Sequence, residues 1–210
     1  MAAPLSQRLR EHTRTAHRRA ERSGVIRQML AGTVSRTAYC LYLRNLQPVY
    51  ATLEQRLSGC PDDNLTATIA DPRVYRASPL ADDLRELVGS TWTEDLPLLP
   101  AAARYRERIA GAADEHLLAH AYVRYLGDLS GGRTLRRVLR DALNLSVHEM
   151  NFYAFPDIPD PGDYKDRFRA AIDRSAATLD PEPILDEARV AFAHNVALAE
   201  AVAAWPVSED

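Results

Sequence analysis

Three glycines interrupt a segment that otherwise has the pattern of one long helix, residues 114–143. Each glycine inside a helix costs about 1 kcal/mol relative to alanine, so Gly127, Gly131 and Gly132 together cost roughly 3 kcal/mol. Gly127 and Gly131 are four residues apart and share a face, while Asp128 and Gly132 form the adjoining row. The sequence thus predicts a bare strip of helix beside one carboxylate, against which a large planar ligand can lie. The alternative is that the glycines only let another helix pack closely.

Composition favours a single soluble domain. With 210 residues, 46% of them hydrophobic, the chain can bury a full core, and we expect one domain over residues 1–210. A net charge of −3 gives no support for nucleic acid as a partner. Cys40 and Cys60 are too few for a disulfide framework. Because neither a signal peptide nor a run of about 18 apolar residues is present, we expect a cytoplasmic protein with no membrane partner.

The apolar pattern is helical along the chain, without strand alternation or an internal repeat, and predicts an all-α fold. Ser6 is a candidate N-cap of the first helix, and Pro79 should occupy the first position of another. Pro48 should kink the second long helix or leave one carbonyl free. The expected helices cover residues 6–32 with a break at 24, 35–59, 78–87, 100–109, 114–143, 163–179 and 183–205, with a Pro-rich loop at 151–162.

Most of the six histidines have ordinary structural explanations. His116 and His120 have the i, i+4 spacing of a helical metal pair, but the glutamate of the His-Glu-x-x-His motif is missing, so we expect them to cap or pack. His12 lies on a charged face and should be solvated. His148 falls at the start of a loop, and His194 should be a surface or packed residue.

His17 differs in its neighbours. Ala16 and Ala20 beside it would let a flat ligand approach the helix. Glu21, one turn on, can accept a hydrogen bond from the second ring nitrogen, which is the usual support of a metal-bound imidazole. On these residues alone, a structural or solvated histidine remains the alternative.

Several segments of the chain resemble one known family. The segment Ala119-His-Ala-Tyr-Val-Arg-Tyr-Leu-Gly-Asp-Leu-Ser-Gly-Gly-Arg-Thr-Leu135 strongly resembles the distal-helix signature of the haem oxygenases. The segment Leu9-Arg-Glu-His-Thr-Arg-Thr-Ala-His-Arg-Arg-Ala-Glu21 is similar to that family's proximal helix, with His17 at the iron-ligand position. Less specific segments follow in family order, at residues 39–57, 100–108, 155–156, 164–169 and 191–195. Since no membrane tail follows, the chain resembles the soluble, bacterial-type, biliverdin-producing members.

The resemblance implies that haem b is sandwiched between the first helix and a glycine-kinked distal helix. His17 would ligate the iron, and Gly127 and Gly131 would let the distal backbone lie over the bound dioxygen. Asp128 would organise water that delivers a proton to the iron-bound peroxide. A plain surface salt bridge between Arg124 and Asp128 is the alternative. The residues implied to act in catalysis are Asp128, Gly127, Gly131, Arg124, Tyr50, Tyr105 and Asn195.

Basic residues are implied to anchor the haem propionates, with arginine at Arg10 and Arg14 where relatives often carry lysine. This anchor pattern favours attack at the α-meso carbon. The residues implied to contact haem are Arg10, His17, Glu21, Tyr122, Gly127, Gly131, Gly132, Lys165, Arg169 and Phe192. Arg18, Arg19 and Arg22 would dock an acidic electron-donor protein, unless they simply form a solvated face.

The resemblance therefore implies oxidative cleavage of haem to biliverdin, as the IXα isomer, with release of CO and Fe2+. Haem would be both substrate and oxygen-activating cofactor, supplied with dioxygen and with electrons from a ferredoxin or a flavoprotein reductase. One alternative is a haem carrier or sensor without turnover, against which Asp128 and its tyrosine partners argue. The other is a haem-free thiaminase-like or di-iron relative of the same fold, although the chain has no Glu-x-x-His pair for a di-iron site.

Overall fold

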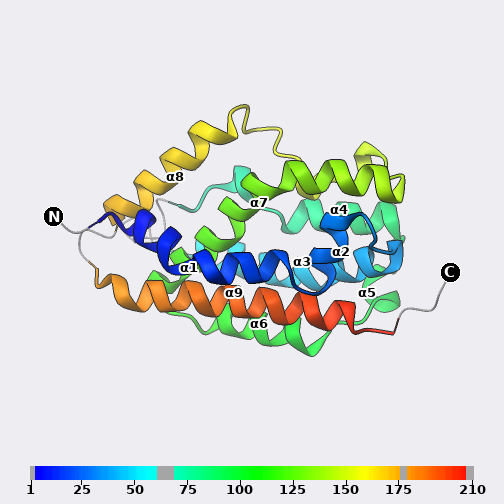
Figure 1. Ribbon diagram of the computed structural model, residues 1–210, viewed down its shortest axis with the longest axis horizontal. Helices are drawn as coiled ribbons and strands as arrows, with labels where there is room; N and C mark the ends of the chain where they lie inside the picture. Colours follow the sequence, from blue (N-terminus) through cyan, green and yellow to red (C-terminus); the bar gives the residue numbers. More distant parts are fainter. Residues whose placement is uncertain (1–2, 61–68, 176–178, 207–210) are drawn as a thin grey trace.

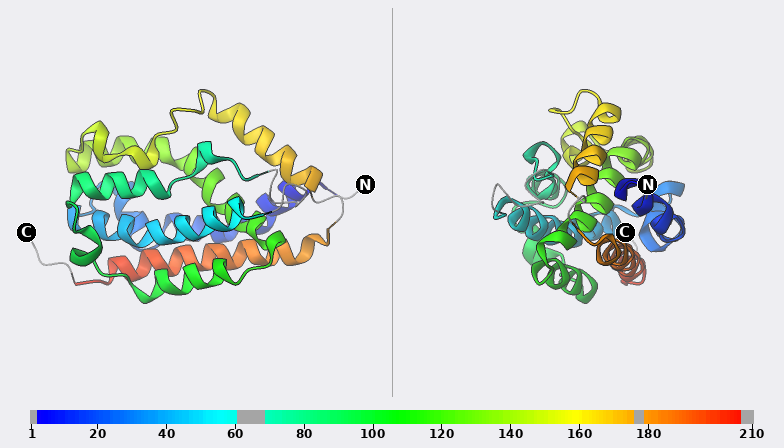
Figure 2. Two further views of the ribbon diagram at one scale, coloured as in Figure 1. Left: turned by 180° about the vertical axis from the view of Figure 1, so that it is seen from behind. Right: turned by 90° about the vertical axis from the view of Figure 1, so that its left-hand side faces the viewer.

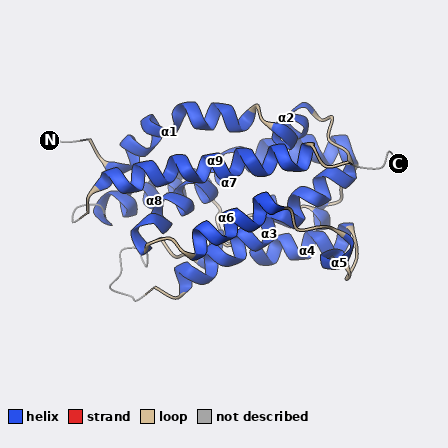
Figure 3. Ribbon diagram, turned by 90° about the horizontal axis from the view of Figure 1, so that it is seen from below, coloured by secondary structure: helices blue, strands red, loops and turns tan. Residues whose placement is uncertain are grey.

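The computed structural model describes residues 3–60, 69–175 and 179–206, which form helices joined by short connections (Figures 1 and 3). These ranges contain no strand, so the all-α prediction is confirmed. The helices are α1 (Leu5–Glu21), α2 (Gly24–Ala31), α3 (Arg36–Ser58), η2 (Pro72–Val74), α4 (Ala77–Leu87), α5 (Trp92–Asp95), α6 (Pro100–Ala110), α7 (Asp114–Leu143), η3 (Val147–Glu149), η4 (Asn151–Tyr153), α8 (Pro161–Ser175) and α9 (Pro181–Ala203).

Several of these boundaries follow the sequence. The glycine-containing helix is α7 and has the predicted bounds, and α3 runs through Pro48 as one helix. Ser35 caps α3, where its hydroxyl accepts the Ala38 N–H at 3.1 Å. Gly24 is the first residue of α2 and has a φ of +45°, and a Cβ at this position would collide with the Ala199 carbonyl of α9. Only glycine combines that conformation with so close an approach.

The start of α1 differs from the prediction. Its N-cap is Pro4, and Ser6 lies inside the first turn. The Ser6 amide and hydroxyl both donate to the Asp173 carboxylate of α8, at 2.7 and 2.8 Å. Ser6 therefore joins two helices that are distant in sequence, a role that local capping rules do not predict.

The other boundary errors are small. Pro79 is the third residue of α4, not the first, because the Glu54 carboxylate already accepts the N–H groups of Arg76 and Ala77. Helices α8 and α9 each begin two residues earlier than predicted, and the four-residue α5 was not predicted. The predicted courses of residues 61–68 and 176–178 lie outside the described residues.

The helices lie around a common interior (Figure 2), which is filled by one cluster of buried apolar side chains. Helix α9 packs along α1 and α7, and α3 packs against α4 and α6. Helix α8 crosses near the beginning of α1, and α7 changes direction along its length (Figure 1). None of the described helices is both long and apolar enough to cross a membrane.

Candidate functional site

A cavity of about 420 Å³ lies between α1 and α7, and we call it the α1–α7 cavity. This volume falls within the usual range of ligand pockets, roughly 300–1,000 Å³. Both long walls are the helices that the sequence predicted as the two sides of a ligand site. The lining residues are Arg10, Thr13, Arg14, His17, Arg18 and Glu21 of α1, Tyr122, Val123, Leu126, Gly127 and Ser130 of α7, Arg169 of α8 and Phe192 of α9.

The α1 wall presents one imidazole to the cavity. The His17 side chain is 53% exposed, and its ring meets the edge of the Phe192 ring at a centroid distance of 5.9 Å. His17 Nδ1 lies 3.7 Å from the Glu21 carboxylate, which is ion-pair range but longer than a hydrogen bond. Ala16 and Ala20 beside His17 are partly buried against the core. The opposite ring nitrogen is thus available to a ligand.

The α7 wall is bare where the sequence predicted it. A Cβ added at Gly127 or at Gly131 would meet no atom within 4 Å, so close helix packing does not require glycine at either position. Gly127 lines the cavity, whereas Gly131 lies one turn beyond. Gly132 faces the protein interior instead, and a Cβ there would be 3.5 Å from the Tyr153 ring. The bare strip therefore consists of Gly127 and Gly131, without Gly132.

This contrast predicts opposite effects on stability and ligand binding for Gly127→Ala. The methyl group has free space in the protein, so the variant should gain up to about 1 kcal/mol of unfolding free energy from helix propensity. The same methyl would occupy the cavity wall and weaken the binding of a flat ligand. Urea denaturation and ligand titration measure the two effects. Gly132→Ala is the matched control, since it adds the same methyl away from the cavity; equal ligand affinity in both variants would contradict the assignment.

Behind the α7 wall, a hydrogen-bonded chain joins three helices. The Tyr50 hydroxyl of α3 donates to the Asp128 carboxylate of α7. Arg124 donates to the Tyr50 oxygen through Nε at 2.8 Å and Nη2 at 2.6 Å, and through Nη1 to Asn195 Oδ1 of α9 at 2.6 Å. Arg124 Nη2 also lies 3.6 Å from Asp128 Oδ1. The predicted network among these four residues is thus present.

The network is buried, which excludes a plain surface salt bridge between Arg124 and Asp128. Their side chains are only 9% and 12% exposed. Burial raises the pKa of Asp128, while the charge of Arg124 and the hydrogen bond from Tyr50 oppose that rise. Burial also raises the pKa of Tyr50 well above its ordinary value, so its hydroxyl keeps its proton and can donate. Such a chain can hold a proton at a defined carboxylate oxygen.

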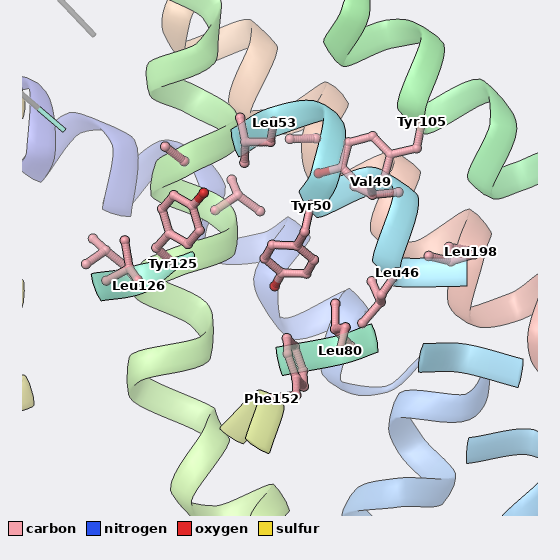
Figure 4. Close-up of a cluster of buried hydrophobic side chains, with 14 of the residues drawn as sticks. Leu46, Val49, Tyr50, Leu53, Leu80, Tyr105, Tyr125, Leu126, Phe152 and Leu198 are labelled. Atoms are coloured by element: carbon pink, nitrogen blue, oxygen red, sulfur yellow. The ribbon is translucent and has the colours of Figure 1, made fainter. Parts of the chain in front are cut away.

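Tyr105 is close to this network but not hydrogen-bonded within it. Its hydroxyl is buried and has no partner in the part of the chain that the structure describes. The ring stacks on His194 at a centroid distance of 5.0 Å and 7° between planes. Figure 4 shows Tyr50 with Tyr105 and Tyr125 among the buried apolar side chains around it.

Basic groups gather at one end of the α1–α7 cavity. Arg10, Arg14 and Arg169 line it together with Tyr122. Lys165 lies at its margin, with Nζ 3.4 Å from Ser130 Oγ. These cations are suited to carboxylates of a bound ligand. Of the arginines predicted to dock a partner, Arg18 lines the cavity, Arg19 lines a neighbouring groove between α1 and α9, and Arg22 is exposed at the end of α1.

His116 and His120 pack as predicted, around one buried carboxylate. Glu187 of α9 is 2% exposed and pairs with Arg108 of α6, with His120 Nε2 at 2.9 Å and with His116 Nδ1 at 3.9 Å. Burial would raise the pKa of Glu187, but the bonds from His120 and Arg108 lower it to about 2. Among the described residues, no group of three potential metal ligands occurs.

His12 differs from the prediction that it is solvated. Its side chain is only 22% exposed, and Nε2 lies 3.6 Å from Asp186 Oδ1 of α9. The cause is the close packing of α9 along α1, which covers a face of α1 that appears polar in the sequence. His194 is a packed residue, in agreement with one of the two predicted options.

Sequence reasoning missed several residues of the site. Thr13, Val123, Leu126 and Ser130 line the cavity. Helical spacing could have found three of them, because Thr13 lies four residues from His17, and Val123 and Ser130 lie four and three residues from Gly127. Leu126 is the chain neighbour of Gly127.

Comparisons with known proteins identify the family of this chain. A sequence model of the heme oxygenase family matches residues 3–201. Heme oxygenase 1 of the cyanobacterium Synechocystis sp. is 36% identical over 204 residues, which cover 93% of this chain and 83% of that protein. Heme oxygenase 1 of Rattus norvegicus is 34% identical over 216 residues, which cover 100% of this chain and 75% of that protein.

Solved structures show the same fold. The crystal structure of the Synechocystis heme oxygenase-1 in complex with heme matches with a TM-score of 0.87 at 34% identity, over 94% of this chain and 91% of that one. The heme oxygenase of Leptospira interrogans matches with a TM-score of 0.88 at 33% identity, over 94% and 99% of the two chains. With a family match across nearly its whole length, the chain belongs to the heme oxygenase family.

Proposed function

We propose that this protein, acting as a single domain over residues 1–210, cleaves haem to biliverdin, CO and Fe2+. The observation that carries the proposal is the pairing of His17 on one wall of the α1–α7 cavity with the bare Gly127 backbone on the other. Neutral imidazole is a standard ligand of haem iron. A flat ligand between the walls would therefore meet a nitrogen donor on one face and open space on the other.

Haem is the substrate in this proposal, and once bound it also supplies the iron that activates dioxygen. The chain binds and orients it. His17 would coordinate the iron, with Glu21 near its other nitrogen, and Phe192 would pack beside the ring. Gly127 and Gly131 would leave room for a small gas molecule on the distal side.

Asp128 is the proposed proton-handling group. Its carboxylate lies one residue from the bare strip and is fixed by Tyr50 and Arg124, with Asn195 holding Arg124 in turn. A carboxylate fixed in this way can orient water on the distal side of the substrate and pass protons to it. Storage or sensing of haem needs no such network, so its presence favours an enzyme over a carrier.

The basic end of the cavity sets the proposed orientation of the substrate. Arg10, Arg169 and Lys165, with Tyr122, would hold the two propionates and so fix the rotation of haem in its plane. We infer attack at the α-meso carbon and the IXα isomer of biliverdin. The electrons would come from an acidic donor protein, a ferredoxin or a flavoprotein reductase, docked near Arg18, Arg19 and Arg22.

The test is to incubate the protein with haem, dioxygen and a chemical reductant and to identify the tetrapyrrole formed. We expect biliverdin IXα, with CO trapped by added deoxymyoglobin. Persistence of the Soret band without biliverdin would show a carrier or sensor, and failure to bind haem would show a haem-free relative. A product of another regiochemistry would contradict only the inferred roles of the anchors.

The His17→Ala variant checks the coordination within the same experiment. Because His17 is the only imidazole lining the α1–α7 cavity in the described part of the chain, we expect loss of the axial-histidine spectrum and at least about tenfold weaker haem binding. His148→Ala is the matched control and should keep the parent spectrum. An unchanged spectrum in His17→Ala would overturn the proposed coordination.

A further inference from the structure

Two hydrogen bonds join the beginning of α1 to the end of α8, and we call them the Ser6–Asp173 latch. The Ser6 amide donates to Asp173 Oδ1 at 2.7 Å, and the Ser6 hydroxyl donates to Asp173 Oδ2 at 2.8 Å. One residue thus engages both oxygens of the carboxylate. Hydrogen bonds to an ionised acceptor are roughly twice as strong as those between neutral groups, so this is a firm connection between two helices that are distant in sequence.

Basic residues of the α1–α7 cavity follow the latch on both helices. On α1, Arg10 lies four residues after Ser6 and lines the cavity. On α8, Arg169 lies four residues before Asp173 and lines the cavity, and Lys165 lies one turn further, at the margin. Because residues four apart share a helix face, each latch residue begins a row that continues into the proposed propionate anchors. Figures 1 and 2 show α1 and α8 meeting at this end and diverging away from it.

The opposite end of α8 is held separately. The Tyr164 hydroxyl donates to Asp71 Oδ2 at 2.9 Å, and the Arg73 guanidinium lies over the Tyr164 ring, 5.5 Å from its centroid. Without the latch, α8 would keep this fixed end and could turn about it. Arg169 lies about 7.5 Å along the helix from Tyr164, so a turn of about 15° would move it by about 2 Å. A displacement of that size breaks a hydrogen bond between an arginine and a carboxylate.

Packing against the core also holds α8, through the buried row Tyr164, Phe168 and Ile172. Apolar contacts of this kind are non-directional, so they press α8 against the core without fixing its tilt. The two latch bonds are directional and lie at the end of α8 that the Tyr164 bond does not hold. The rival explanation is that core packing alone places Arg169, in which case the latch is dispensable.

We propose that the Ser6–Asp173 latch determines product specificity: it holds Arg169 opposite Arg10, so that these anchors accept one rotation of haem in its plane and one biliverdin isomer forms. This inference deepens the proposed function and rests on it, since haem is the ligand whose rotation is fixed. Neither latch residue is among those that line the cavity. Both are therefore positioning residues, which act through the anchors. The role requires the two hydrogen bonds and not the charge of Asp173 as such.

The decisive comparison is between Asp173→Ala, which removes both bonds, and Asp173→Asn, which removes only the charge. In Asp173→Asn the amide oxygen can still accept the Ser6 N–H, and the amide nitrogen can donate to the Ser6 hydroxyl oxygen. Ser6→Ala loses only the hydroxyl bond. Chromatography of the product should show that the share of isomers other than the parent's main product rises about tenfold in Asp173→Ala and about threefold in Ser6→Ala, and stays within about twofold of the parent in Asp173→Asn.

Two further measurements do not depend on turnover. The haem methyl shifts in proton NMR of the ferric cyanide complex report the rotation of haem; they should change in Asp173→Ala and match the parent in Asp173→Asn. In the haem-free protein, the Ser6 amide lies in the first turn of α1, where a backbone N–H has no acceptor within the helix. Its exchange with solvent should therefore be at least about tenfold faster in Asp173→Ala than in the parent.

Glu182→Ala is the matched control. Glu182 of α9 pairs with Arg8, close to Ser6 on α1, but α9 lines the cavity through Phe192, which is not an anchor. This variant should keep the isomer ratio and the methyl shifts of the parent.

The parent's isomer ratio and methyl shifts in Asp173→Ala would overturn the proposal and leave core packing as the explanation. Equal changes in Asp173→Ala and Asp173→Asn would also overturn it, because they would assign the effect to the charge. If Asp173→Ala does not fold, a parent-like ratio and parent-like shifts in Ser6→Ala have the same consequence. If the parent binds haem without cleaving it, the proposed function fails, while the methyl shifts and the amide exchange still test the latch.

Discussion

Replacing Asp128 with alanine is expected to leave haem binding nearly intact and to lower the rate of biliverdin formation at least about 100-fold. The carboxylate is the end of the chain from Asn195 through Arg124 and Tyr50, and it is the group in that chain nearest the bare strip of α7. A positioned acid–base group commonly contributes about 100- to 10,000-fold to a rate. Haem should still be held by His17 and the basic end of the cavity, neither of which contacts Asp128.

Two measurements decide this prediction: Soret titration for haem affinity, and single-turnover biliverdin yield with a chemical reductant. Asp141→Ala is the matched control, since Asp141 also lies on α7 but is 63% exposed and pairs with its neighbour Arg140. The control should behave as the parent does. An ordinary biliverdin yield from Asp128→Ala would refute the proposed role of this carboxylate. Loss of haem binding would instead show that Asp128 supports the pocket.

Helical periodicity indicated the bare face of α7, and the family resemblance paired this face with His17 on α1. In a helix, residues four apart share a face, so Gly127 and Gly131 could be placed together before any coordinates were known. The same rule puts Ala16 and Ala20 beside His17. The resemblance implied that Gly132 contacts haem, but spacing does not say which neighbouring row of the helix faces the core. The ring of Tyr153, which comes from a distant turn, decides that question.

The family resemblance named residues of the buried network that helical periodicity could not identify. No spacing rule links Tyr50, Arg124 and Asn195, which come from α3, α7 and α9 and meet only in the folded protein. The family pattern named these residues, and the hydrogen bonds are present. Tyr105 was named in the same way, yet its hydroxyl forms no bond to the network among the described residues. In this case, the resemblance predicted that Tyr105 lies near the network but did not predict the contacts of its hydroxyl.

Neither helical periodicity nor the family resemblance predicted the contacts between residues that are far apart in the sequence. His12 appeared solvated because its helical neighbours are charged, but α9 covers it. Ser6 was predicted to be a helix cap, but its amide and hydroxyl donate hydrogen bonds to the Asp173 carboxylate of α8. The same applies to Arg76 and Glu187, whose partners lie far away along the chain. Such contacts depend on which helices become neighbours in the fold, and the residues next to a given position in the sequence do not determine this.

Replacing Glu187 with glutamine is expected to lower the free energy of unfolding at pH 7 by about 2–3 kcal/mol. Glu187 is a buried carboxylate that neutralises Arg108 and accepts a bond from the fully buried His120. Glutamine keeps the shape but removes the charge, which leaves the buried His120 and the half-exposed Arg108 without their anionic partner. Urea unfolding of the haem-free protein measures the effect. Glu182→Gln is the matched control, because Glu182 pairs with Arg8 at the surface, and it should change stability by no more than about 0.5 kcal/mol.

The pH dependence separates loss of the charge from simple loss of packing. The pKa of folded Glu187 is lowered to about 2, below its value in the unfolded chain, so the ionised form stabilises the fold above the unfolded pKa. That stabilisation declines as the pH falls from about 5 towards 2. The difference between the parent and Glu187→Gln should therefore shrink steadily as the pH falls below about 5. A difference that keeps its full size down to pH 4 and below would show that glutamine fails for steric reasons, and the electrostatic explanation would be wrong.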